Sequence, residues 1–142
     1  MKSKIVSADE TVSHIRDGNV IATSGFTGSC NAEELHHALL RRFHKTGKPR
    51  DLTILFAAGQ GDGSGKRGLD IIALEGLVKR LIFSHCGLMP RISKLIMENK
   101  VLAYSFPQGV LSQLFREIAA KRPGLITHVG LHTYCDPRIE GG

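Results

Sequence analysis

The stretch Leu52-Thr-Ile-Leu-Phe56, followed by Ala57-Ala-Gly-Gln-Gly-Asp-Gly-Ser-Gly65, decides the fold class. The first five residues are apolar and partly β-branched, which is typical of a parallel strand that is covered on both faces. A glycine-rich loop directly after such a strand is typical of the ligand crevice in an open α/β sheet. A P-loop ends in Gly-Lys followed by Ser or Thr, whereas Arg67 follows Gly65 and Lys66 here, so the loop does not match a P-loop. The pattern therefore predicts either a mobile surface loop or part of a ligand crevice.

Helical and strand patterns alternate along the rest of the chain. Ser7 with Glu10 is typical of the capping box of a short helix, and Asn31 with Glu34 predicts the cap of a second helix. This alternation predicts one α/β domain over residues 1–142, with a mainly parallel open sheet and flanking helices. Further strands are expected at residues 20–23, 77–84, 101–104 and 125–129, and further helices at 90–99 and 109–121.

Composition excludes several classes of protein. Of the 142 residues, 42% are hydrophobic and 23% are charged, which is typical of a globular chain. We find no apolar run long enough to span a bilayer and no signal peptide, so we expect a cytoplasmic protein. The seven histidines show no zinc-ligand spacing, and we expect no metal site. The cysteines Cys30, Cys86 and Cys135 are far apart and are expected to be reduced thiols.

The chain is basic, with a formal charge of +6 and a pI of about 9.5. Solvated helix faces explain most of this charge, although attraction of an anionic ligand stays open. Nucleic-acid binding is disfavoured, because the chain has no Trp, only 6% aromatic residues and no groove-reading motif.

Three segments carry candidate chemistry. The turn Ser24-Gly-Phe-Thr-Gly28 can present backbone N–H groups to an anion, or its glycines can be steric requirements. Gln108, in Phe106-Pro-Gln-Gly109, can donate to an oxyanion or can cap the following helix. His85 and Cys86 are neighbours on an extended chain and point to opposite sides, which disfavours a reactive pair. These residues alone leave the reaction unnamed.

A series of short motifs runs along nearly the whole chain in a characteristic order. The motifs are Asp17-Gly-Asn-Val-Ile-Ala-Thr-Ser-Gly-Phe26, Gly61-Asp-Gly63, Arg67-Gly-Leu-Asp70, Glu75-Gly-Leu-Val-Lys-Arg80, Gly87-Leu-Met-Pro-Arg91, Glu98-Asn-Lys100, Phe106-Pro-Gln-Gly-Val-Leu111, Pro123-Gly124, Asp136-Pro-Arg138 and Gly141-Gly142. In this order and spacing the chain resembles the first, α-type half of family I coenzyme A transferases, the short-chain acyl-CoA:acetate/3-ketoacid CoA transferases. Two details depart from the family pattern: Ser24 replaces a usual glycine, and Cys30-Asn31-Ala32 stands where glycine and proline are common.

The resemblance implies an enzyme of short-chain fatty acid or ketone-body metabolism. Such an enzyme moves CoA from a short-chain acyl-CoA to a carboxylate such as acetate, through a glutamyl-CoA thioester and without a cofactor. By this resemblance Gln108 is the oxyanion donor. Four residues are expected to bind substrate: Gly25, Phe26, Gly28 and Gly109.

The resemblance also implies that the chain is incomplete. The nucleophilic glutamate of the family lies in its second half, so we expect no nucleophile here and do not assign that role to Glu140. We expect a truncated α-type domain that is inactive alone, with a complementary β-type half as partner and a homo-oligomer as the complete enzyme. The alternative is a non-catalytic α/β remnant that binds acyl-CoA or only associates with a partner.

Overall fold

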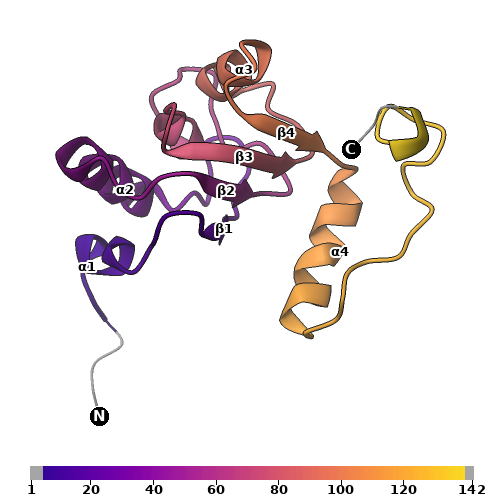
Figure 1. Cartoon of the computed structure of the whole chain (residues 1–142), viewed down its shortest axis with the longest axis horizontal. Coiled ribbons are helices and arrows are strands. Elements are labelled where there is room, and N and C mark those ends of the chain that lie inside the picture. Colours follow the sequence, from indigo (N-terminus) through magenta and orange to yellow (C-terminus); the bar gives the residue numbers. More distant parts are fainter. Residues whose placement is uncertain (1–4, 140–142) are drawn as a thin grey trace.

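A parallel sheet of four strands organises the molecule, which a computed structural model describes over residues 5–139 (Figure 1). All three strand pairs are parallel, and the spatial order β1-β2-β3-β4 follows the order in the chain. The predicted open parallel sheet is therefore confirmed. The strands are β1 Val20–Ala22, β2 Leu52–Leu55, β3 Val78–Phe83 and β4 Leu102–Ser105.

Helices connect the strands and extend beyond the last one. The Ser7 side chain accepts a hydrogen bond of 3.1 Å from the Glu10 N–H, which confirms the predicted cap of the first helix. The predicted Asn31 cap is wrong: Ala32 occupies the N-cap position, and the Asn31 amide turns back to donate to the Thr27 carbonyl. The helices are α1 Ala8–Ser13, α2 Glu33–Thr46, α3 Pro90–Met97 and α4 Gln108–Ala119, with 3₁₀ turns η1 Gly68–Ile72 and η2 Pro137–Ile139.

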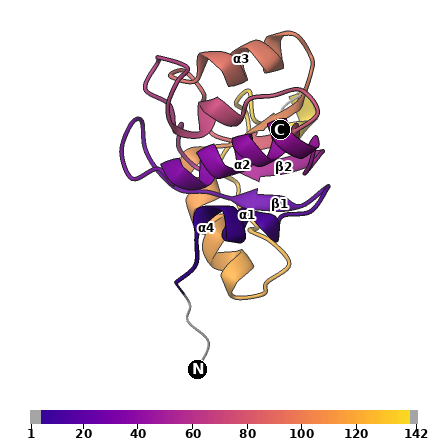
Figure 2. The ribbon, with the colours of Figure 1, turned by 90° about the vertical axis from the view of Figure 1, so that its left-hand side faces the viewer.

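The hydrophobic core lies on one face of the sheet, between the strands and the layer formed by α1, α2, η1 and α3. Ile21, Ile54, Leu81 and Ala103 form one row across the four strands on this face. They pack against side chains such as Leu39 of α2 in a single buried cluster. Figure 2 shows α1 and α2 on the near side of the strands and α4 on the far side. Successive side chains of a strand point to opposite faces of the sheet, so every second side chain points into this core.

The second face of the sheet carries apolar side chains outside that cluster. Two rows cross this face, Val20-Thr53-Arg80-Leu102 and Ala22-Leu55-Ile82-Tyr104. None of these eight residues belongs to the buried core cluster. Val20 is 66% exposed and Leu102 is 47% exposed, although parallel sheets normally have both faces covered. We call these eight residues the second sheet face.

The segment after α4 corrects one prediction. Residues 125–129 were expected to form a strand, but they are irregular and run back along α4. Ile126 is fully exposed, and within residues 5–139 no strand pairs with the backbone of this segment. An apolar β-branched run becomes a strand only where a neighbouring strand completes its hydrogen bonds.

Within residues 5–139, no helix is long and apolar enough to cross a bilayer.

Candidate functional site

The four strands end at one edge of the sheet, so the loops that follow them meet there. In Figure 1 the strand arrows point toward α4. Parallel strands necessarily share their carboxyl edge, which is where open α/β sheets bind ligands. The loops comprise residues 23–32 after β1, 56–67 after β2, 84–89 after β3 and 106–107 after β4. All of the candidate segments from the sequence lie in these loops or directly after them.

The loop after β1 forms a tight turn. The N–H groups of Phe26 and Ser29 donate to each other's carbonyl oxygens at 3.0 and 2.9 Å. Gly25 has φ +150°, and a Cβ there would lie only 2.0 Å from Asn31 Oδ1, so glycine is required. Asn31 Oδ1 is buried and has no hydrogen-bond partner among the described residues. Phe26 is 58% exposed, so the predicted substrate-binding residues Gly25, Phe26 and Gly28 share one turn whose aromatic ring faces solvent.

A buried amide joins this turn to the loop after β2. Gln60 is fully buried, and its Nε2 donates to the Thr23 carbonyl at 3.1 Å. The Thr23 hydroxyl in turn donates to Gln60 Oε1 at 3.1 Å. The Gln60 carbonyl accepts from the Leu69 N–H at 3.0 Å. Sequence reasoning missed Gln60, although it is the one amide side chain within the glycine run and could have been singled out for that reason.

The loop after β2 also packs against the loop after β3. The Gly59 N–H donates to His85 Nε2 at 3.3 Å. A Cβ on Gly61 would lie 2.1 Å from the Leu88 carbonyl oxygen, so this position requires glycine. Residues 58–61 are buried, whereas residues 62–64 are exposed. The loop is thus a packed support over its first half and a surface loop only over its second half.

Two titratable groups in this region have shifted pKa values. Hydrogen bonds from the Ser64 hydroxyl and N–H lower the pKa of the exposed Asp62 carboxyl. Burial raises the pKa of Asp70, although the carboxylate accepts from the Arg91 and Ile92 N–H groups at the start of α3. Asp62 is therefore ionised at neutral pH, and Asp70 joins η1 to α3.

His85 and Cys86 have separate partners, as predicted. His85 Nε2 accepts from Gly59, whereas Cys86 Sγ accepts from the Ser93 hydroxyl at 3.4 Å. Cys86 and the other two cysteines are free thiols. Among the residues that the structure describes, no group of three or more His, Cys, Asp or Glu side chains is placed to hold a metal ion.

Gln108 and Gly109 lie at the other end of this edge, in the first turn of α4. β1 and β4 are the outer strands, so about three strand spacings, roughly 14 Å, separate them. Gln108 is exposed, and no hydrogen bond joins its side-chain amide to another residue in the described part of the chain. Because its amide has no partner among the described residues, Gln108 does not cap the helix, which was the second alternative from the sequence. A Cβ on Gly109 would meet nothing within 4 Å, so folding does not require glycine there.

Helix α4 links these two ends of the site. It begins beside the tip of β4 and runs past the strand ends toward the level of β1 (Figure 1). Phe115, two turns after Gln108, lies with Ala22, Thr23 and Ser24 around a hollow of about 180 Å³. The structure thus places Gly25, Phe26 and Gly28 together, places Gln108 and Gly109 together, and separates the two groups along one edge that α4 borders.

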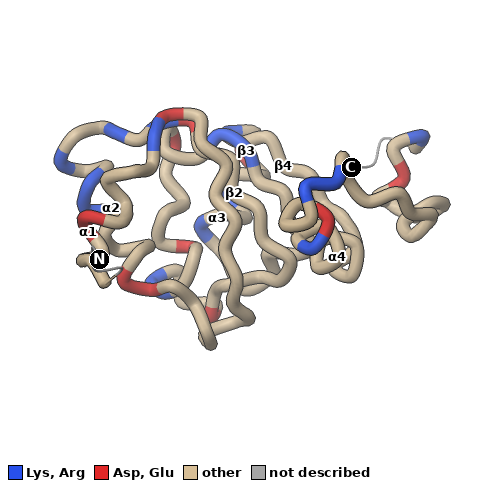
Figure 3. Tube along the Cα trace, turned by 90° about the horizontal axis from the view of Figure 1, so that it is seen from below, with Lys and Arg blue, Asp and Glu red and all other residues tan. Residues whose placement is uncertain are grey.

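Basic residues do not form a single patch on the molecule. Figure 3 shows Lys and Arg at several separate places along the chain. Many of them pair with carboxylates: Arg41 with Asp9 and Glu34, and Arg122 with Glu117. This distribution agrees with the expectation that most of the positive charge lies on solvated faces.

The comparisons with known proteins assign the family. The sequence pattern of the Coenzyme A transferase family matches residues 5–141. The chain is 42% identical to the acetate CoA-transferase YdiF of Escherichia coli (strain K12) over 97% of its length, which is 26% of that protein. It is 41% identical to the caffeate CoA-transferase of Acetobacterium woodii over 99% of its length, again 26% of that protein.

A solved structure agrees with this assignment. The acyl-CoA transferase YdiF from Escherichia coli O157:H7, as a thioester complex with CoA, superposes with a TM-score of 0.86 at 40% identity. The match covers 96% of this chain and 28% of that one, so this chain spans about a quarter of the length of these three relatives. The chain belongs to the coenzyme A transferase family, of which it carries the α-type segment.

Proposed function

We propose that this chain is the α-type part of an enzyme that moves CoA from a short-chain acyl-CoA to a carboxylate such as acetate. The observation that carries the proposal is the carboxyl edge of the sheet, which the Gly25–Gly28 turn and Gln108 border from its two ends. The 42% identity to an acetate CoA-transferase supports this substrate class. The similar protein of Acetobacterium woodii is named a caffeate CoA-transferase, so the identity of the acyl group that the enzyme accepts stays open.

The proposed chemistry is a sequence of two exchanges on a glutamate. The glutamate carboxylate attacks the thioester carbonyl and the C–S bond breaks. CoA departs as the thiolate, and the product on the glutamate is an acyl–glutamyl anhydride. The thiolate then attacks the glutamyl carbonyl, which gives a glutamyl-CoA thioester and releases the first carboxylate. A second carboxylate reverses these steps and takes the CoA. The similar YdiF structure, a thioester complex with CoA, supports a covalent route. The proposed route uses no cofactor besides the CoA of the substrate.

This chain contributes binding and charge stabilisation to that sequence. When the glutamate attacks, the carbonyl oxygen becomes an oxyanion, and the neutral Gln108 amide can donate to it. The amide is free for this role, since no described residue binds it. The turn at Gly25, Phe26 and Gly28, together with Gly109, borders the acyl-CoA. The glutamate itself belongs to the second, β-type half, so we expect the chain alone not to turn over.

The second sheet face and α4 fit the docking of that other half. On α4, the residue Leu111 is buried, whereas Ile118 on the same apolar stripe is 53% exposed. Ile118 of α4, and Val20 and Leu102 of the second sheet face, are thus exposed apolar side chains of the kind that a second layer normally covers. The two YdiF proteins have about three quarters of their length beyond the region matched here, which is enough chain for such a layer. The complete enzyme is proposed to be a cytoplasmic homo-oligomer that acts in short-chain fatty acid or ketone-body metabolism.

The second candidate is a non-catalytic module that binds acyl-CoA or only associates with a partner. The exposed apolar second sheet face favours it, because that face explains association without any chemistry. The two candidates differ in whether the assembled complex transfers CoA.

A CoA-exchange assay tests the proposal. Acetyl-CoA or propionyl-CoA is mixed with isotopically labelled acetate, first with this chain alone and then with the separately produced C-terminal part of acetate CoA-transferase. We expect exchange only in the mixture. Exchange by this chain alone would mean that it carries its own nucleophile. No exchange in a mixture that forms a complex by size-exclusion chromatography would favour the non-catalytic module.

A further inference from the structure

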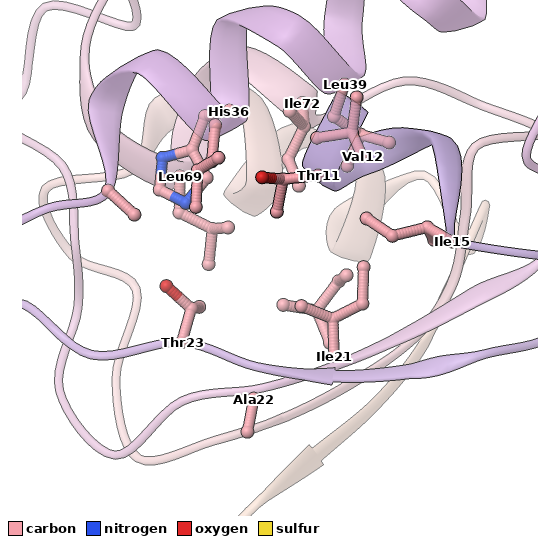
Figure 4. Close-up of a pocket in the computed structure, with 13 residues that line it drawn as sticks. Thr11, Val12, Ile15, Ile21, Ala22, Thr23, His36, Leu39, Leu69 and Ile72 are labelled. Atoms are coloured by element: carbon pink, nitrogen blue, oxygen red, sulfur yellow. The ribbon is translucent and has the colours of Figure 1, made fainter. Parts of the chain in front are cut away.

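A cavity lies between the sheet and its helical layer, and Thr23 and Ala32 of the loop after β1 form part of its wall. It has a volume of about 120 Å³ and is bounded by α1, α2, β1 and η1 (Figure 4). In Figure 4, Ile21 and Thr23 point from β1 toward the helices, whereas Ala22 points away. Most of the wall is aliphatic, including Leu39, Leu69 and Ile72. Leu35, which also lines the cavity, is 38% exposed, so the cavity reaches the surface beside α2.

One polar group in the wall lacks a partner. His36 is 94% buried, since only 6% of its surface is exposed, and its Nδ1 has no hydrogen-bond partner within residues 5–139. Burial lowers the pKa of His36, so the ring is neutral at pH 7. The Gly68 backbone acts to raise the pKa of His36, as a group that accepts from the ring does. Because Nδ1 has no partner, we infer that Nε2 faces Gly68 and carries the proton. In a neutral imidazole whose Nε2 carries the proton, Nδ1 is an acceptor.

The two other polar side chains of the wall, Thr11 and Thr23, already donate their hydroxyl protons to other groups. The Thr11 hydroxyl donates to the Ser7 carbonyl at 2.9 Å. The Thr23 hydroxyl donates to Gln60 Oε1. Each oxygen keeps lone pairs, so Thr11, Thr23 and His36 present acceptors and no donors. A buried acceptor without a donor is energetically unfavourable, which makes a donor-bearing occupant favourable.

The volume of the cavity and the charge of its wall further restrict the kind of molecule that can bind. A cavity of about 150 Å³ with a similar aliphatic wall is known to hold benzene. A carboxylate or an ammonium ion would lose its hydration here and gain no opposite charge, because no ionised side chain lines the cavity.

We propose that this cavity binds a small neutral molecule that combines an apolar body with one hydrogen-bond donor, the chemistry of a phenol or a short branched alcohol. The donor binds His36 Nδ1, and the apolar body fills the space between Ile21, Leu39 and Ile72. This site is independent of CoA transfer and does not rest on the function proposed above.

The test is an NMR titration of the isotope-labelled chain with phenol, toluene and benzoate as probes. We expect phenol to bind about tenfold more tightly than toluene, which has the same size but no donor, since one hydrogen bond has about that effect. We expect benzoate not to bind. Phenol protons should show nuclear Overhauser contacts to the methyl groups of Leu39 and Ile72. Equal affinity for phenol and toluene, or the absence of these contacts, would overturn the proposal.

Three variants locate the site and its polar contact. Thr11→Leu fills the cavity and should weaken phenol binding at least about tenfold. Ser13→Leu, on the same helix and outside the cavity, removes a similar hydroxyl-to-carbonyl bond and should leave binding unchanged. His36→Leu should abolish the preference for phenol over toluene. If Thr11→Leu perturbs the folded spectrum, the Overhauser contacts in the unmodified chain still decide the outcome.

Discussion

Thr23 and Gln60 bind each other twice, amide to carbonyl and hydroxyl to amide, and so fix the end of β1 to the loop after β2. The two residues are 37 positions apart in the chain. Gln60 is completely buried, so no water competes for its amide. This pair positions the Gly25–Gly28 turn relative to the glycine-rich loop.

Replacing Gln60 is therefore expected to destabilise the chain. Gln60→Ala leaves the Thr23 carbonyl without its donor and opens space in a packed region, which should lower the free energy of unfolding by about 1–3 kcal/mol. Urea denaturation measures this change. Gln113→Ala, an exposed amide on α4, is the matched control and should change stability by less than about 0.5 kcal/mol. Equal stability of the two variants would remove Gln60 from its structural role.

Replacing Gln108 is expected to affect the reaction and not the fold. Its side chain is exposed, and Gln108→Ala should slow CoA exchange in the assembled enzyme by on the order of a hundredfold. The unfolding midpoint of the chain should stay the same. Gln113→Ala serves again as the control, because it lies on the same helix. An unchanged exchange rate for Gln108→Ala would exclude the residue from oxyanion stabilisation.

Two glycines should respond oppositely to alanine. Gly61→Ala brings a methyl group within 2.1 Å of the Leu88 carbonyl oxygen and should cost about 1–3 kcal/mol of stability. Gly109→Ala meets nothing within 4 Å in the first turn of α4 and should stabilise by about 0.5–1 kcal/mol. Thermal unfolding distinguishes them. If Gly109→Ala folds normally but loses CoA exchange, the substrate-binding role of Gly109 gains support; normal exchange would contradict that role.

The turn around Asp136 should loosen in acid. The Asp136 carboxylate accepts from Arg138 Nη2 at 2.6 Å and from the His132 N–H at 2.7 Å, and its pKa is held far below 3.8, chiefly by Arg138. Because the folded pKa is depressed, the stabilisation is complete above the ordinary pKa and is lost as the pH falls below about 4. The amide chemical shift of His132, followed from pH 6 to pH 2, reports this loss. A midpoint above pH 4, or the same profile in Asp136→Asn, would contradict the assignment.

A charge on the second sheet face should block assembly and leave the chain folded. Val20 is 66% exposed, so Val20→Glu should change the stability of the isolated chain by less than about 0.5 kcal/mol. Burying that carboxylate against the other half should weaken association at least about tenfold. Titration of one half with the other, monitored by calorimetry, measures this effect. Ser13→Glu, on the surface of α1, is the control; equal affinities of the two variants would place the interface elsewhere.

The sequence predicted the sheet and most of its helices because their signals are local. Ser7 caps α1, and the apolar run at 52–55 forms β2, as expected from patterns within a few residues. The two wrong predictions, the Asn31 cap and the strand at residues 125–129, concern positions whose structure depends on residues outside the local pattern. Asn31 has the right spacing for a cap, but its amide is drawn to Thr27 by the turn after β1. Residues 125–129 have strand composition, but no strand in the described part of the chain pairs with them.

The candidate site was predictable in its position and less so in its internal contacts. The rule that ligands bind at the carboxyl edge placed the loops correctly. The burial of Gln60 against Thr23, and the need for glycine at Gly61, arise from loops that meet only after the sheet has formed. The roles of Gln108, Gly25, Phe26, Gly28 and Gly109 in substrate binding stay predictions.

The strand order has a consequence for synthesis on the ribosome. Each strand pairs with the one made just before it, so every new strand extends an existing edge and none must insert between two others. The last fully buried member of the core cluster, Ile92, precedes β4 and α4. A nascent chain can therefore bury its core cotranslationally while the residues of α4 are still inside the exit tunnel. The protein would then present a folded sheet, with its second face still open, to whatever polypeptide completes it.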